Sequence, residues 1–365
     1  MALARRTPAC QPAGRMARIV FVNGVAAPTL AAGQVLDSPV ASVRLRCLVP
    51  AAGLRALGHE TGLVSLTDIA RPGIAERLRD PAIRIVLGKP TPGTFALHPG
   101  ICSAALDALE RLAAARPIHA DVCDLMAADE GPAGRHRDLV LGRFVPVVPS
   151  RWLADHYRPR CHHAPLVVED PAETEEMARP RFAPGPELRF VWFGTWGPGT
   201  ARLLARTLDG IRLADRRLSL TVVTQTEAAG EVTRLADAMI DRVEGSWRIT
   251  HRDWSLPAVT AALADADFVL LPQPAGDPRA DAKSHNRLVE AIRQGRFALA
   301  APIPAYRELD RGAWVGEASE GVRWALANPA EALARIAAGQ AEVRLRFSPA
   351  AVARRWAAAL VLPSP

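Results

Sequence analysis

The stretch Asp267–Ala301, DFVLLPQPAGDPRADAKSHNRLVEAIRQGRFALAA, decides how this chain folds. It opens with an apolar run, Asp267–Pro272, whose length suits a buried strand. A helical pattern follows over Lys283–Gln294, and Gly295 stands where a C′ glycine would end that helix. A second apolar run, Phe297–Ala301, reads as the next strand. Strand, helix and strand in this order predict a βαβ unit, in which the two strands are parallel and the helix covers the sheet.

The same alternation extends along the rest of the chain. Further strands are expected at Arg18–Asn23, Gly62–Leu66, Ile83–Lys89, Pro117–Val122, Val145–Pro149, Leu188–Phe193, Leu218–Thr224 and Trp247–His251. Further helices are expected near Val43–Leu57, Ile101–Ala115, Ser150–Tyr157, Thr200–Leu213, Val232–Val243, Leu256–Leu263, Glu331–Val343 and Ala350–Leu360. This pattern predicts an α/β protein of two Rossmann-like domains, whose parallel sheets face a central cleft that binds the ligand.

One segment without periodicity divides the chain. Glu169–Glu187, EDPAETEEMARPRFAPGPE, is rich in proline and acids, which indicates a linker. We therefore expect an N-terminal Rossmann-like domain over 17–168 and a C-terminal Rossmann-like domain over 188–347. Residues 348–365 are expected to form a C-terminal helix that could pack back on the N-terminal domain. Residues 1–16 are rich in Pro, Arg and Ala and lack the apolar core of a secretory signal, so we expect a disordered tail.

Composition excludes several classes of protein. The net charge of +7 comes from arginines spread among acids, without the basic blocks or aromatic interleaving of nucleic-acid binders. No apolar run approaches the roughly 18 residues of a membrane span, so we expect a cytoplasmic protein with at most peripheral contact at the inner face of the membrane. The 5 cysteines show no paired spacing, which argues against a disulfide framework and a structural zinc site. We expect no metal site.

Lysine is almost absent from the chain. Among 45 basic residues, only Lys89 and Lys283 are lysines. Arginine can replace lysine where charge alone matters, but not where a compact, flexible ammonium group is required. Each lysine ends or follows a predicted strand, where α/β proteins place their ligands. Lys89 is therefore a candidate binding residue, although chance survival explains it equally well.

The predicted helix Lys283–Gln294 carries polar residues on one face. At 3.6 residues per turn, Lys283, Asn286, Arg287, Glu290 and Gln294 lie on the same side. Two cations near its start oppose the helix dipole and repel each other at i, i+4. A bound anion such as pyrophosphate would remove both conflicts, and Glu290 would then reach a hydroxylated group such as a ribose. The alternative is a solvated face with an Arg287–Glu290 pair.

A glycine-rich turn follows the strand Leu188–Phe193 and opens the next helix. Gly194, Thr195, Gly197 and Gly199 belong to this turn, GTWGPG, whose context suits a backbone that approaches a phosphate. The spacing is not GxGxxG, and no acid ends the following strand, which argues against a nicotinamide dehydrogenase. A purely structural turn is the alternative.

Four further residues are candidates. Asp121 and Asp124 end a strand of the first half, and carboxylates facing a cleft there could orient or deprotonate a hydroxyl. They could equally be a helix N-cap and a solvated acid. Arg44 opens a helix and could bind an anion or cap the helix. Trp254 follows a strand and could stack a nucleobase or belong to the core.

Together these features resemble the GT-B glycosyltransferases of the family-4, or glycosyltransferase group 1, type. The resemblance covers nearly the whole chain and is most specific over Ala266–Glu308, with its DADFVLLPQ, KSHNRLVEAIRQG and FALAAPIPAYREL segments. It implies that Glu290 holds the donor ribose and that Lys283 and Arg287 hold the diphosphate. It also implies that the Gly194–Gly199 turn borders the phosphates and the acceptor. By the same resemblance the C-terminal domain binds the donor and the N-terminal domain binds the acceptor, with Arg44 and Lys89 on the acceptor side.

Two positions depart from this resemblance. The acid usually found eight residues before the helix glutamate is Ala282 here, with Asp281 one place away. The usual His–Asp after the first-domain strand is Cys123-Asp124. Both departures concern the stereochemical outcome and catalysis.

The resemblance implies a metal-independent hexosyltransferase without a cofactor. It would move a sugar from a nucleotide-diphosphate donor to the hydroxyl of a carbohydrate, lipid-linked or small-molecule acceptor, with no nucleic acid involved. Lys283 and Arg287 would stabilise the leaving diphosphate, and Asp121 or Asp124 would handle the acceptor. The alternatives are a nucleotide-sugar epimerase or polyol-phosphate transferase of the same fold, and a non-catalytic nucleotide-sugar-binding partner protein.

Overall fold

The computed structural model describes residues 16–24, 38, 40–71, 73–90, 92–126, 130–213, 215–240 and 247–362. The predicted disordered tail therefore lies outside the described residues, except for Met16. Two six-stranded sheets form the framework, and neighbouring strands are parallel in both. The first contains β1 (Arg18–Asn23), β2 (Glu60–Ser65), β3 (Ile83–Leu87), β4 (Ile118–Asp121), β5 (Val145–Val148) and β6 (Leu166–Val167). The second contains β7 (Glu187–Phe193), β8 (Arg217–Thr224), β9 (Trp247–Asp253), β10 (Phe268–Leu271), β11 (Phe297–Ala300) and β12 (Trp314–Val315).

In both sheets the order in which successive strands are added reverses at an internal point. The first has the order β2-β1-β3-β4-β5-β6, and the second has the order β12-β11-β10-β7-β8-β9. The order reverses between β1 and β3 in the first sheet and between β7 and β10 in the second. Doubly wound sheets bind ligands beyond the carboxyl ends of their strands at such points. The loops after these strands are therefore the first places to look for a site.

Helices cover both sheets. Those of the N-terminal domain are α1 (Ala41–Val43), the π-helical turn η1 (Arg44–Leu48), α2 (Val49–Ala56), α3 (Leu66–Ile69), α4 (Ile74–Arg77), α5 (Pro92–Leu97), α6 (Pro99–Ala113), α7 (Gly131–Gly142) and α8 (Arg151–Tyr157). Those of the C-terminal domain are α9 (Thr200–Gly210), η2 (Thr226–Ala228), α10 (Ala229–Ile240), α11 (Leu256–Asp265), α12 (Pro278–Asp281), α13 (Asn286–Arg293), α14 (Pro304–Arg307), η3 (Asp310–Gly312) and α15 (Ala318–Ala327). The last two helices are α16 (Pro329–Arg346) and α17 (Pro349–Ala359).

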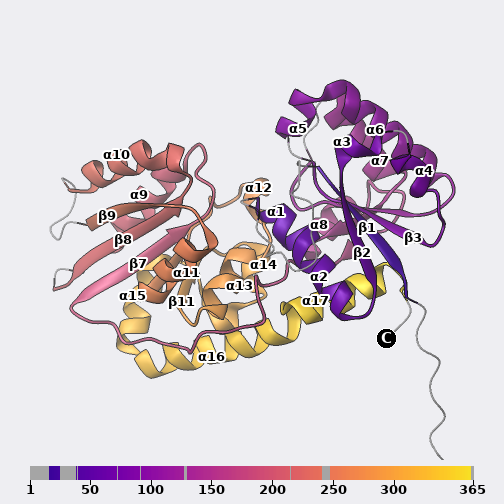
Figure 1. Ribbon diagram of the computed structural model, residues 1–365. Helices are drawn as coiled ribbons and strands as arrows, with labels where there is room; N and C mark the ends of the chain where they lie inside the picture. Colours follow the sequence, from indigo (N-terminus) through magenta and orange to yellow (C-terminus); the bar gives the residue numbers. More distant parts are fainter. Residues whose placement is uncertain are drawn as a thin grey trace, which may run out of the picture.

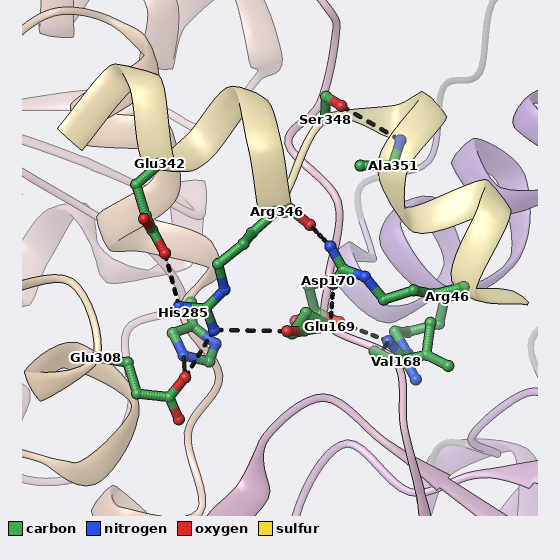
Figure 2. Close-up of polar contacts among 11 residues, drawn as sticks. Arg46, Val168, Glu169, Asp170, His285, Glu308, Glu342, Arg346, Ser348 and Ala351 are labelled. Atoms are coloured by element: carbon green, nitrogen blue, oxygen red, sulfur yellow. Dashed lines mark hydrogen bonds and ion pairs between the residues drawn. The ribbon is translucent and has the colours of Figure 1, made fainter. Parts of the chain in front are cut away.

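Serine caps fix several helix starts. Ser150 accepts a hydrogen bond from the Leu153 amide at 3.3 Å, which confirms the N-cap predicted there. Ser348 accepts one from the Ala351 amide at 3.3 Å and starts α17 (Figure 2).

The final helices join the two domains. α16 runs beneath the C-terminal domain, and α17 continues to the side of α2 in the N-terminal domain (Figure 1). Trp356 of α17 is fully buried, and its ring lies edge-on to Phe21 of β1 with 6.0 Å between the ring centroids. Burial of an aromatic side chain of this size is worth a few kcal/mol, so α17 belongs to the N-terminal core.

The segment 168–186, between β6 and β7, contains neither helix nor strand but lies closely along α13. The amide of Ala178 donates to the Arg293 carbonyl, and that of Arg181 donates to the Gly295 carbonyl, both at 3.0 Å. Gly295 has a φ of +66°, which confirms the predicted C′ glycine. A Cβ at this position would lie 2.5 Å from the Arg179 carbonyl oxygen, so the close approach of this segment also requires glycine.

The structure contains elements that the sequence did not predict, and one predicted helix starts at another residue. The two-residue strands β6 and β12 and the helices α7 and α15 were not predicted. The predicted helix Lys283–Gln294 begins three residues later, at Asn286, so Lys283 precedes α13 and is not part of it. The expected i, i+4 repulsion between Lys283 and Arg287 inside one helix is therefore wrong. Contacts of residues 282–284 with the N-terminal domain and with the segment 168–186 override the helical pattern.

Candidate functional site

Both lysines of the chain contact one carboxylate, that of Asp124. Lys89 follows β3 and its Nζ lies 2.5 Å from Asp124 Oδ2. Lys283 lies between α12 and α13, and its Nζ donates to Asp124 Oδ1 at 2.8 Å. Burial acts to raise the pKa of Asp124, but the two ammonium groups outweigh it and lower that pKa. The contact joins the loop beyond β10 in the second sheet to the loop beyond β4 in the first.

The residues on either side of Lys283 also contact the N-terminal domain or the segment 168–186. Ala282 is fully buried and packs in the apolar cluster of the N-terminal domain. Ser284 Oγ donates to Asp170 Oδ2 at 2.5 Å, and Asp170 belongs to the segment that joins the sheets. Three consecutive side chains thus fix the approach to α13, which is the physical reason for the later helix start.

Glu290 is buried in α13 with both oxygens paired. Arg293 Nε lies 2.9 Å from Glu290 Oε2, and Arg293 Nη2 lies 2.5 Å from Oε1. The Arg287–Glu290 pair considered from the sequence is therefore replaced by an Arg293–Glu290 pair. A carboxylate can accept about four hydrogen bonds, so the pairing leaves Glu290 acceptor capacity for a hydroxyl.

Arg287 extends over the glycine-rich turn. Its Nη1 lies 3.5 Å from the Phe193 carbonyl oxygen at the end of β7. Gly194 has a φ of +146°, and a Cβ there would lie 3.3 Å from Arg287 Nη1. Glycine therefore lets the Arg287 guanidinium and the turn approach each other. Asn286, the residue before Arg287, is the first residue of α13.

Hydrogen bonds from Gln225 and Thr200 hold the rest of the glycine-rich turn. Gln225, directly after β8, accepts from the Trp196 amide at 2.9 Å and donates to the Trp196 carbonyl at 2.8 Å. Gly197 donates its amide to Thr200 Oγ1 at 3.1 Å, and Gly199 opens α9 with a φ of +85°. Thr195 is exposed at the top of the turn.

Asp121 does not face a cleft, contrary to the prediction. Its side chain is fully buried, and Oδ1 accepts from Arg46 Nε at 2.7 Å. Arg46 also contacts Asp170 Oδ1 at 3.2 Å and donates to the Val168 carbonyl at 2.5 Å (Figure 2). Burial raises the pKa of Asp121 in opposition to Arg46. Asp121 therefore belongs to a buried network that joins η1, β4 and the segment 168–186.

Arg44 and Trp254 contact each other. The guanidinium carbon of Arg44 lies 4.8 Å from the centre of a Trp254 ring, and Arg44 Nη2 lies 3.0 Å from Glu173 Oε1. The charge of Arg44 is thus balanced by a carboxylate of the chain itself. A nucleobase would have to stack on the opposite face of Trp254 or displace Arg44.

A further ionic cluster surrounds Arg346, the last residue of α16. Arg346 contacts Glu308 Oε2 at 2.7 Å, Glu342 Oε1 at 3.0 Å and Glu169 Oε1 at 3.5 Å (Figure 2). The buried His285 lies 3.3 Å from the same Glu308 oxygen. Burial acts to raise the pKa of Glu308, but His285 and Arg346 outweigh it and lower that pKa to about 2.

Sequence reasoning missed Asp170, Glu173 and Gln225. The first two are acids within the predicted linker, and nothing in the sequence indicates that their partners lie across the fold. Gln225 directly follows a predicted strand at the carboxyl edge of the sheet, which is a signal that could have identified it.

Neither a cluster of metal ligands nor a membrane-spanning helix is present among the described residues. Within the described ranges, no three His, Cys, Asp or Glu side chains come together as metal ligands could. No helix in this part of the chain is both long and apolar enough to cross a membrane.

Comparisons with known proteins agree on the architecture. No protein-family model and no curated protein sequence matches the chain. Among solved structures, Anabaena HepE in complex with UDP and glucose is similar with a TM-score of 0.62 and 12% identity over 94% of this chain and 99% of HepE. A mutant of T4 phage BGT in complex with UDP-glucose gives a TM-score of 0.56 and 9% identity over 94% of this chain and 100% of BGT.

A third structure is the lipopolysaccharide outer core galactosyltransferase WaaB, with a TM-score of 0.56 and 10% identity over 94% of this chain and 99% of WaaB. At such identities the likeness concerns the fold. The chain has the GT-B fold, with two Rossmann-like domains built on parallel sheets.

Proposed function

We propose that this protein is a glycosyltransferase of the hexosyltransferase type. It transfers a sugar from a nucleotide-diphosphate donor to the hydroxyl of a carbohydrate, lipid-linked or small-molecule acceptor. The observation that carries the proposal is the approach of Arg287 to the Gly194 turn at the carboxyl edge of the second sheet, with Lys283 in the connection that leads into the same helix. Similar folds hold UDP and glucose in HepE and UDP-glucose in BGT.

The charges at this edge suit a leaving diphosphate. Negative charge develops on the diphosphate as the bond to the sugar breaks, and fixed cations stabilise it. Lys283 and Arg287 would supply these cations, and the start of α13 adds its dipole. The chain's own cations would thus supply the charge that a metal ion provides in other transferases, so we propose a metal-independent reaction without a cofactor.

Glu290 would accept hydrogen bonds from the donor ribose. Arg293 holds its carboxylate in one orientation from within the helix, which prepares it for such a contact. Asp124 is a poor general base because Lys89 and Lys283 lower its pKa. We therefore do not assign proton transfer to Asp124 or to the buried Asp121.

A specific observation favours a second candidate, a non-catalytic nucleotide-sugar-binding protein. Ala282 replaces an acid of the family pattern and is fully buried against the N-terminal domain. A sugar-handling carboxylate is therefore missing at this position. Such a protein would bind the donor without cleaving it.

A thermal-shift panel of UDP-, GDP-, dTDP- and CMP-sugars tests the proposal. A ligand present at 100 times its Kd adds about 2.7 kcal/mol to the free energy of unfolding. We expect one nucleotide to stabilise the protein well above the others, and slow hydrolysis of that donor without acceptor. Stabilisation without hydrolysis or transfer would favour the binding protein, and no stabilisation by any donor would contradict both candidates.

A further inference from the structure

The contact between Lys89, Asp124 and Lys283 has an excess of positive charge. Two ammonium groups share one carboxylate, so the three side chains together carry one positive charge. Arg46 pairs with both Asp121 and Asp170, so this neighbouring buried group carries the opposite net charge. The two ammonium groups nevertheless contact a single carboxylate, and a phosphate group in its place would offer them more charge and more acceptor oxygens.

The cluster is poorly suited to a purely structural role. The exposed fractions of the side chains are 34% for Lys89, 33% for Asp124 and 46% for Lys283. Ion pairs with this degree of exposure contribute little to stability, and each lysine loses rotamer freedom to form one. The chain uses arginine almost everywhere else, so a stabilising pair would not require lysine.

The position of the cluster favours a ligand. Lys89 follows β3 at the point where the strand order of the first sheet reverses, and Lys283 lies in the connection after β10, at the corresponding point of the second. Asp124 follows β4, which neighbours β3. The two ligand-binding edges of the fold thus meet at one carboxylate.

We propose that Lys89 and Lys283 together form a phosphate-binding site between the two domains, which Asp124 occupies until a phosphate group displaces its carboxylate. The role of Lys283 rests on the proposed function, whereas Lys89 and Asp124 are new parts of the site. Carboxylate and phosphate oxygens accept hydrogen bonds from ammonium groups in the same way, and phosphate brings more charge and more oxygens. The group belongs either to the donor diphosphate or to a phosphorylated acceptor.

Titration calorimetry with inorganic pyrophosphate tests the site. Asp124→Asn keeps the shape and one acceptor oxygen but removes the competing charge, so it should bind pyrophosphate about tenfold more tightly at low salt. Lys89→Ala should bind it about tenfold more weakly than the wild type does. Arg279→Ala, which removes an exposed charge from α12 nearby, is the control and should match the wild type within about twofold.

Two further titrations identify the source of the phosphate. If the site takes the donor diphosphate, Lys89→Ala weakens binding of UDP itself. If it takes a phosphorylated acceptor, UDP binding is unchanged and Lys89→Ala instead weakens binding of glycerol 3-phosphate to the protein saturated with UDP. Either result supports the site.

Three results would overturn the proposal. The first is that the wild type does not bind pyrophosphate. The second is that Asp124→Asn binds pyrophosphate as tightly as the wild type or more weakly. The third is that Lys89→Ala binds pyrophosphate, UDP and glycerol 3-phosphate as tightly as the wild type does. If the variants change pyrophosphate binding as expected but the protein binds no nucleotide sugar, the phosphate site is supported and the proposed function is wrong. If the protein binds a nucleotide sugar but the variants do not change pyrophosphate binding, the proposed function is supported and the phosphate site is wrong.

Discussion

Lys283 and Asp124 are 159 residues apart in the sequence, and their charged atoms lie 2.8 Å apart. This contact links the loop beyond β10 in the C-terminal domain to the loop beyond β4 in the N-terminal domain. A cation that we assign to the donor therefore already contacts the acceptor domain. Substitutions at the two ends of this contact should affect ligand binding more than they affect folding.

The two neighbouring acids Asp121 and Asp124 should behave differently when changed to asparagine. Asp121→Asn breaks a fully buried ion pair with Arg46 and should lower the free energy of unfolding by up to about 3 kcal/mol, since Asp170 still balances part of the charge. Asp124→Asn removes a partly exposed partner and should cost less than about 1 kcal/mol. Urea denaturation of both variants measures this difference, and equal losses would show that the two sites were assigned wrongly.

Glu290→Gln should lower both stability and donor binding. The change weakens the buried pair with Arg293, so we expect a loss of roughly 1.5 kcal/mol in the free energy of unfolding. It should also weaken nucleotide-sugar binding through the ribose while leaving pyrophosphate binding unchanged. Glu320→Gln, an exposed acid on α15, is the control. Equal weakening for sugar nucleotide and pyrophosphate would argue against a ribose contact.

Glu308 should make the protein sensitive to acid. Its pKa is about 2 in the folded protein and 4.5 for the ordinary group, so the folded state favours the carboxylate. The resulting stability is fully present above pH 4.5 and is lost as the pH falls toward 2. Glu308→Gln should cost on the order of 2 to 3 kcal/mol at neutral pH. That difference from the wild type should shrink below pH 4.5 in denaturation curves, and a constant difference across the acid range would contradict the assignment.

Much of the fold could be predicted from the sequence because its signals are local. Apolar runs such as Phe297–Ala301 and the glycine at 295 mark element boundaries without any tertiary information. The strands β6 and β12 were missed because two residues carry no periodicity. The sequence pattern also allows Lys283 inside the helix, and the contacts of Ala282, Lys283 and Ser284 across the fold keep it outside.

The candidate site was predictable only in its separate parts. The scarcity of lysine singled out Lys89 and Lys283, but nothing in the sequence indicates that they meet at one carboxylate. Asp121 and Asp124 look equivalent as neighbouring acids, and the buried Arg46 distinguishes them. Such pairings depend on how the domains come together, which local patterns do not record.

Calorimetric titration of the preferred nucleotide sugar into the wild type, Lys283→Ala and Lys283→Arg tests the donor site most directly. A charge-assisted contact to phosphate is worth roughly 1.5 to 3 kcal/mol, so Lys283→Ala should bind at least about tenfold more weakly. Lys283→Arg should restore the affinity only in part, because a planar guanidinium fits a point-charge site poorly. Arg279→Ala controls for the loss of charge and should bind as the wild type does. If Lys283→Ala binds the donor as tightly as the wild type, the assignment of the donor site is wrong.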